Sequence, residues 1–198
     1  PQAERQATFD PLEGFDLNPW DKLDDVPEKT VNAAKTLLDD MLASLDRKEL
    51  RKAVSLITRA RLIDIIGVEN SMVPATDLFT KLNYLGLTCR LNADVVVAFS
   101  HSGRSADTIK ALRLAKSRDA HTIVITNTPD APIGNWADVR LLAGREDRKI
   151  YGSAIFSRTA HIAMVDILYM AVILSDYGRF STELDRSGRY IQDRGFGA

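Results

Sequence analysis

The sequence predicts an α/β protein: a three-layer α/β/α sandwich around a parallel sheet of about five strands, with extra helices at both ends. Short runs of β-branched and other apolar residues recur along the chain, and such runs are typical of strands that are buried on both faces. Between several of them lie segments of ten or more residues with helical apolar spacing, as the crossovers of a parallel sheet require. The chain has 198 residues and is 45% hydrophobic, enough for one domain with a substantial core.

Composition excludes several classes of protein. The 26 Lys and Arg residues nearly balance the 27 Asp and Glu residues, which argues against a protein that mainly wraps nucleic acid or coats an acidic membrane. Cys89 is the only cysteine, so an internal disulfide and a cysteine-based zinc site are excluded. No apolar run approaches the ~18 residues of a membrane span, and no signal pattern opens the chain. We therefore expect a soluble, cytoplasmic protein that has no membrane partner and uses no metal or cofactor.

The N-terminal part divides into an arm and the start of a domain. Residues 1–27 are rich in Pro, Asp and Gly and lack periodicity, so we expect a linker or arm followed by a domain over 28–198. Apolar residues then recur at helical spacing over 31–45. Asp46, with Glu49 three residues later, predicts a capping box at the start of the next helix.

Strands and helices alternate over the rest of the chain. The expected strands are 62–66, a weak one at 88–91, then 94–99, 121–126 and 139–142. The expected helices are 71–85, 104–117, 153–174 and 181–192. His161 lies among apolar neighbours in the third of these helices, so we expect a core or interface histidine there.

The residues that directly follow each strand are the candidates for function, because parallel sheets bind ligands at the carboxyl ends of their strands. The segment from Ser100 to Ser105 places three serines and Gly103 between the strongest strand and a helix N-terminus. Free N–H groups and the helix dipole favour an anion there, and serine hydroxyls can donate to phosphate oxygens. The segment lacks the glycines and lysine of a nucleotide P-loop. It predicts a site for a compact phosphate monoester; the alternative is that the serines only cap the helix.

The loop after the first strand is expected to complete this site. The expected ligand-binding residues are Gly67, Asn70, Ser71, Ser100, His101, Ser102, Gly103 and Ser105.

The segment Ser100-His101-Ser102-Gly103-Arg104-Ser105 resembles the signature of the sugar isomerase (SIS) domain, a flavodoxin-like fold that binds phosphosugars. The resemblance extends over about residues 46–177, and Ser105 replaces the family's usual Thr while keeping the hydroxyl. Within the family, the chain is most similar to the effector domain of RpiR-type bacterial transcriptional regulators. That likeness includes the Thr-Asn-Thr-Pro-Asp segment at 126–130 and the long helix that follows Ser157.

The resemblance implies a sugar-phosphate sensor, acting for a regulator of sugar metabolism. DNA would be bound only through an N-terminal helix-turn-helix that is absent here, and the partners would be a phosphorylated sugar and further copies of the chain. Apolar surface on the helices at 31–45 and 154–174 favours a homodimer or homotetramer. The alternative function is a phosphosugar aldose–ketose isomerase, which needs a base poised near neutral pH. Glu69, where the family usually has a small residue, and His101 would then be the catalytic candidates.

One connection departs from the family pattern. Leu91-Asn92-Ala93 joins the weak second strand to the third almost directly, whereas neighbouring parallel strands need a crossover of about a dozen residues. Either this protein has lost the crossover, or residues are missing between Leu91 and Asn92; we expect the second, so that Leu91 and Asn92 are not true neighbours in the protein.

Overall fold

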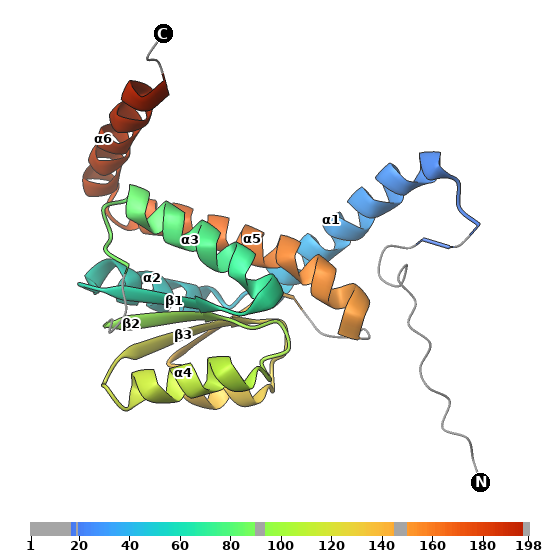
Figure 1. Cartoon of the computed structure of the whole chain (residues 1–198), viewed down its shortest axis with the longest axis horizontal. Helices are drawn as coiled ribbons and strands as arrows, with labels where there is room; N and C mark the ends of the chain where they lie inside the picture. The colour runs from blue at the N-terminus through green and yellow to red at the C-terminus, as the bar shows by residue number, and fades with distance from the viewer. Residues whose placement is uncertain (1–16, 19, 90–93, 145–149, 196–198) are drawn as a thin grey trace.

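The fold is a parallel sheet covered by helices on both faces (Figure 1). The computed structural model describes residues 17–18, 20–89, 94–144 and 150–195. Its four strands are all parallel and lie in the order β1-β2-β3-β4. They are β1 (Ile63–Gly67), β2 (Val95–Phe99), β3 (His121–Thr126) and β4 (Val139–Leu142).

The weak strand expected at 88–91 is reduced to one bridge in the described part of the chain. Cys89 forms a parallel bridge with Ile63, and the N–H of Ile63 donates to the carbonyl oxygen of Thr88 at 2.9 Å. Residues 90–93 are outside the described residues, and so is the expected break between Leu91 and Asn92. Ile63 also pairs with Val95 of β2, so Cys89 lies on the opposite side of β1. The order of the strands therefore reverses between β1 and β2, where such sheets bind ligands.

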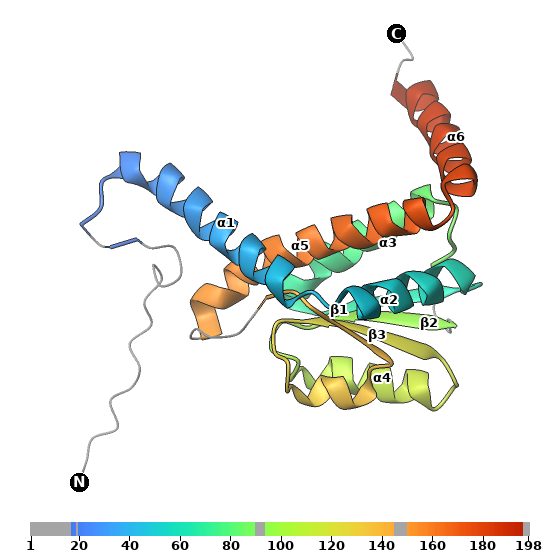
Figure 2. The same ribbon diagram turned by 180° about the vertical axis from the view of Figure 1, so that it is seen from behind.

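The helices form two layers and two extensions (Figures 1 and 2). On one face lie α2 (Arg47–Arg59), α3 (Met72–Tyr84) and α5 (Ile150–Ser175). On the other lie α4 (Ala106–Lys116) and the 3₁₀ helix η3 (Pro132–Trp136). Two short 3₁₀ helices, η1 (Leu23–Asp25) and η2 (Glu69–Ser71), precede α1 (Val26–Ser44) and α3. α1 and α6 (Tyr177–Gly195) extend away from the sheet.

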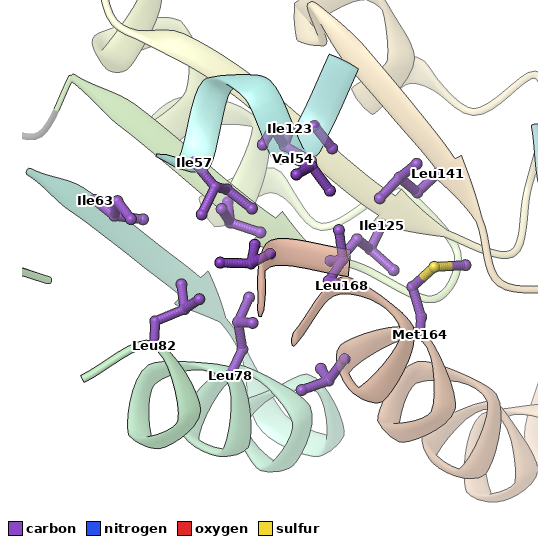
Figure 3. Packing of buried hydrophobic residues seen from close by; sticks show 14 of the residues in the cluster. Val54, Ile57, Ile63, Leu78, Leu82, Ile123, Ile125, Leu141, Met164 and Leu168 are labelled. Atoms are coloured by element: carbon purple, nitrogen blue, oxygen red, sulfur yellow. The ribbon is translucent and has the colours of Figure 1, made fainter. Parts of the chain in front are cut away.

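The side chains of β2 explain why its sequence is continuously apolar. Val95, Val97 and Phe99 belong to the core beneath α2, α3 and α5, whereas Val96 and Ala98 belong to the core beneath α4. All five residues are buried, as expected for a strand with helices on both faces. Figure 3 shows the larger core, in which side chains of α2, α3 and α5 meet those of the sheet. The three-layer sandwich is therefore confirmed, with four strands.

One local prediction was half right. Asp46 caps α2, because its Oδ1 accepts from the N–H groups of Lys48 at 2.7 Å and Glu49 at 3.3 Å. Glu49 does not complete a capping box: its carboxylate accepts from the N–H of Arg140 at 3.2 Å. Glu49 therefore covers a backbone donor on the edge strand β4.

The expectation that no apolar run approaches the length of a membrane span was wrong: within the described residues, Arg158–Ser175 of α5 is long and apolar enough to cross a membrane by length and composition alone. It packs against α3 and the sheet, where Met164, Leu168 and Val172 are fully buried. Burial of this kind is what a core helix of an α/β domain requires.

Candidate functional site

The parallel register brings the predicted loops to one edge of the sheet. Gly67, the last residue of β1, pairs with Phe99, the last residue of β2. Phe99 pairs in turn with Ile125 of β3. The segments that follow Gly67, Phe99 and Thr126 therefore leave the sheet at the same end, as the sequence predicted.

The loop between β2 and α4 has the hydroxyl groups that an anion site needs. Ser100 is buried, and Ser102 and Ser105 are half-buried. Ser105 is the N-cap of α4, and its Oγ accepts from the N–H of Thr108 at 3.5 Å. The Oγ of Ser102 accepts from the N–H of Arg104 at 3.4 Å. Both serines thus cap local backbone groups, but an accepting hydroxyl keeps its hydrogen for a further acceptor, so capping and anion binding are compatible.

Gly103 fixes the shape of this loop. Its φ of +61° lies in the left-handed region that side chains disfavour. A Cβ at this position would lie 2.4 Å from the Cβ of Ala131 and 2.8 Å from Cγ2 of Ile133. Only glycine allows the loop to approach the segment after β3 this closely.

Gly67 allows the backbone around Ser71 to pack closely against the end of β1. A Cβ there would lie 2.3 Å from the carbonyl oxygen of Ser71. The intervening turn is closed by the N–H of Ser71, which donates to Val68 at 3.0 Å. Asn70 is exposed and Ser71 is half-buried, so this turn presents polar groups at the edge of the sheet.

The two catalytic candidates lie in neighbouring loops. Glu69 is exposed and has a φ of +53°, a conformation that costs a non-glycine residue roughly 1–2 kcal/mol. His101 is half-buried in the loop after β2. Both residues lie in loops that leave the sheet at the same end, because Gly67 of β1 pairs with Phe99 of β2.

His161 lies in the core directly beneath this end of the sheet. It is 1% exposed, and its ring is tilted against that of Phe99, with centroids 6.0 Å apart. Burial, and secondly the charge of His101, lower the pKa of His161 from 6.5 to about 3. The imidazole is therefore neutral at physiological pH, which confirms the expected core histidine.

The sequence did not single out the residues that hold the loop in place. The carbonyl oxygen of His101 accepts from Thr126 Oγ1 at 3.1 Å, from the N–H of Asn127 at 3.1 Å and from Thr128 Oγ1 at 3.4 Å. In the sequence these residues stood out only as part of the Thr-Asn-Thr-Pro-Asp segment at 126–130 that resembles the RpiR-type regulators. The signal available in the sequence was the run Thr126-Asn127-Thr128, three consecutive residues with hydrogen-bonding side chains at the end of a predicted strand.

The described residues offer two further observations about ligands. Among them, no group of three or more His, Cys, Asp or Glu side chains could hold a metal ion. An open groove of about 340 Å³ lies between the start of α2 and the edge strand β4, and is lined in part by Asp46, Glu49 and Arg140. It lies at β4 rather than at the Ser100–Ser105 loop, and the Glu49 carboxylate already bonds the edge there.

Comparison with known proteins agrees with this geometry. Residues 90–171 match the SIS domain family. An uncharacterized HTH-type transcriptional regulator of Haemophilus influenzae is 27% identical over 173 residues, which cover 80% of this chain and 60% of that protein. The chain thus spans less than two thirds of the length of this relative.

Solved structures share the fold. The Vibrio vulnificus NanR protein complexed with ManNAc-6P has a TM-score of 0.81 at 22% identity, over 89% of this chain and 72% of that one. The sugar isomerase domain of an RpiR transcription factor from Sphaerobacter thermophilus has a TM-score of 0.71 at 21% identity, over 83% of this chain and 98% of that one. Residues 90–171 of the chain thus match a SIS domain, and its relatives include the HTH-type transcriptional regulators HexR, at 26% identity, and RpiR, at 22% identity, of Escherichia coli.

Proposed function

We propose that this chain is the sensor domain of a bacterial transcriptional regulator of sugar metabolism, and that it binds a phosphorylated sugar. The proposal rests on the Ser100–Ser105 loop at the N-terminus of α4. It is supported by homologues that are HTH-type regulators and by a structural neighbour that was solved with ManNAc-6P. In this proposal the DNA-binding part lies on a longer chain, and the protein works in the cytoplasm. Residues 1–27 would then act as the linker and 28–198 as the sensor.

The chemistry of the loop suits a phosphate monoester. The first N–H groups of α4 have no intrahelical acceptors, and the helix dipole adds positive potential at the same point. Ser102 and Ser105 keep hydroxyl hydrogens to donate. Gly67, Asn70 and Ser71 would complete the site from the neighbouring loop, with Ser100 and Gly103 shaping its floor.

Substitution of Ser102 tests the site. We expect Ser102→Ala to remove one hydrogen bond to a charged group, which is worth roughly 1.5–3 kcal/mol, so affinity should fall about 10- to 150-fold. Thermal-shift titrations with phosphorylated hexoses, pentoses and amino sugars would first identify the tightest ligand. The control is Ser117→Ala at the opposite end of α4, whose hydroxyl donates to the carbonyl of Leu114. Equal affinities of Ser102→Ala and Ser117→Ala would contradict the proposed site.

The second candidate function is phosphosugar isomerisation, favoured by the strained turn at Glu69. An isomerase would exchange the C2 proton of a bound sugar phosphate with D₂O, which NMR detects. A sensor should bind without exchange. Exchange that disappears in Glu69→Gln or in a His101 variant would make the protein an isomerase.

We further propose that the chain forms a homodimer or homotetramer through its extended helices. α1 buries only Met41 and leaves Val31 and Leu42 about half exposed. α5 exposes Met170 and Leu174 on the side away from the sheet. Pairing would remove this apolar surface from water. A monomer at micromolar concentration in sedimentation velocity would contradict the proposal.

A further inference from the structure

The loop that carries the serines is held by a second segment, residues 126–133, which we call the β3–η3 segment. Its first three residues direct hydrogen-bond donors at one acceptor, the carbonyl oxygen of His101. The N–H of Thr128 also donates to Thr126 Oγ1 at 3.3 Å, which orients that hydroxyl. Thr126 is fully buried, so its bonds are shielded from competing water.

The same segment holds the loop at a second point. The carbonyl oxygen of Gly103 accepts from the N–H of Ile133 at 3.1 Å. Ala131 and Ile133 lie so close to Gly103 that a Cβ would overlap them, and Thr126 Oγ1 would lie 3.3 Å from it. Alternate carbonyls of the loop are therefore turned toward the β3–η3 segment.

Because the peptide bond is planar, these hydrogen bonds to loop carbonyls also fix the direction of the N–H groups that follow them. In a trans peptide the carbonyl and the following N–H point in opposite directions. With the His101 carbonyl turned toward Thr126, the N–H of Ser102 points away from the β3–η3 segment. With the Gly103 carbonyl turned the same way, the N–H of Arg104 also points away, and it lies 3.4 Å from Ser102 Oγ. Both N–H groups are aimed before any ligand arrives.

We infer that Thr126 is a positioning residue of the anion site: its hydroxyl locks the His101 peptide so that the Ser102 N–H faces a bound phosphate. This inference rests on the proposed function and adds a residue that does not itself touch the ligand. A loop fixed in advance loses less conformational freedom on binding, which raises affinity.

Three variants on one strand test the inference. Thr126→Val removes the hydroxyl at nearly constant volume, and Thr126→Ser keeps it. The control is Thr122→Val, four residues earlier on β3. Thr122 is equally buried, and its Oγ1 donates to the carbonyl oxygen of Trp136 at 2.7 Å. It is about 13 Å from Thr126 along the strand.

Inorganic phosphate is the probe, titrated against the amide spectrum of the ¹⁵N-labelled chain at a temperature where every variant is folded. We expect Thr126→Val to weaken phosphate binding about 3- to 10-fold, as loss of one neutral hydrogen bond implies. The Ser102 amide signal of the free protein should also shift in this variant. Thr126→Ser and Thr122→Val should bind like the unsubstituted chain, although Thr122→Val unfolds at a lower temperature.

Two outcomes would overturn the inference and leave the proposed function standing. One is wild-type affinity in Thr126→Val while Ser102→Ala still loses affinity. The other is an equal loss in Thr122→Val, which would trace the effect to general weakening of β3. If the unsubstituted chain binds neither inorganic phosphate nor any sugar phosphate, the proposed function fails, and the inference fails with it.

Discussion

The buried imidazole of His161 should make the stability of the protein fall as the pH is lowered toward 5. Among the described residues its Nε2 has no hydrogen-bond partner, and the side chain is 1% exposed. Burial, reinforced by the charge of His101, lowers its pKa from 6.5 to about 3. The unfolded chain therefore takes up a proton below pH 6.5 that the folded chain refuses until about pH 3. Stability from this residue is full above pH 6.5 and is lost progressively as the pH falls.

The size of the effect follows from linkage. Between pH 7 and pH 5, protonation of the unfolded chain alone lowers the free energy of unfolding by about 2 kcal/mol. His161→Leu removes the titrating group and fills the site with an apolar side chain, so it should remove this part of the pH dependence. At pH 7 the variant should be as stable as the unsubstituted chain or slightly more so, because a buried unpaired nitrogen is lost.

Urea denaturation followed by circular dichroism at pH 5, 6 and 7 measures the difference. His121→Gln is the control, because it also removes a histidine, but one whose side chain is 61% exposed. A pH slope that decreases in His161→Leu but not in His121→Gln would assign this part of the pH dependence to the buried ring. Identical pH slopes for His161→Leu and the unsubstituted chain would refute the reasoning from burial.

Two further predictions concern backbone conformation and acid stability. Gly103→Ala should destabilise the protein by more than the ~1–2 kcal/mol that a left-handed residue costs, because its Cβ would overlap Ala131. Gly86→Ala, with a φ of +70° but only a flexible glutamate side chain nearby, should show the backbone cost alone when melting temperatures are compared. A hydrogen bond from the Arg61 side chain, with help from the Arg61 N–H, lowers the pKa of Asp94. Asp94→Asn should therefore be less stable than the unsubstituted chain at pH 6, and urea titrations should show the difference shrinking as the pH falls through that lowered pKa.

The strands, and the edge of the sheet at which the candidate loops lie, could be predicted from short sequence patterns and the rules of parallel sheets. β2 is buried on both faces, and its run of five apolar residues shows this directly. The common position of the candidate loops follows from topology, since parallel strands end at the same edge and the register of Gly67 with Phe99 brings the loops that follow them to that edge. Of the weak strand expected at 88–91, the described residues include one bridge, between Cys89 and Ile63, and residues 90–91 lie outside the described part of the chain.

Contacts between distant segments could not be predicted in this way. Glu49 has the spacing of a capping box, but it bonds the N–H of Arg140, 91 residues away. The spacing of two residues within one helical turn carries no information about a distant edge strand whose backbone N–H group has no hydrogen-bond acceptor from a neighbouring strand. The same limit applied to Thr126, whose bond to His101 spans 25 residues.

In the proposed site, the division between local and distant contacts would also explain how the roles of the serine loop and the β3–η3 segment differ. The serines and Gly103 belong to one short motif, so a sequence can reveal which atoms are available to a phosphate. The direction of the N–H groups is set by carbonyls that bond to Thr126, Asn127 and Ile133. Substitutions in the motif should therefore remove contacts with a ligand. Substitutions in the β3–η3 segment should leave the loop N–H groups in place but change the direction in which they point. Affinity would then depend on both segments, although only the motif can be recognised from sequence.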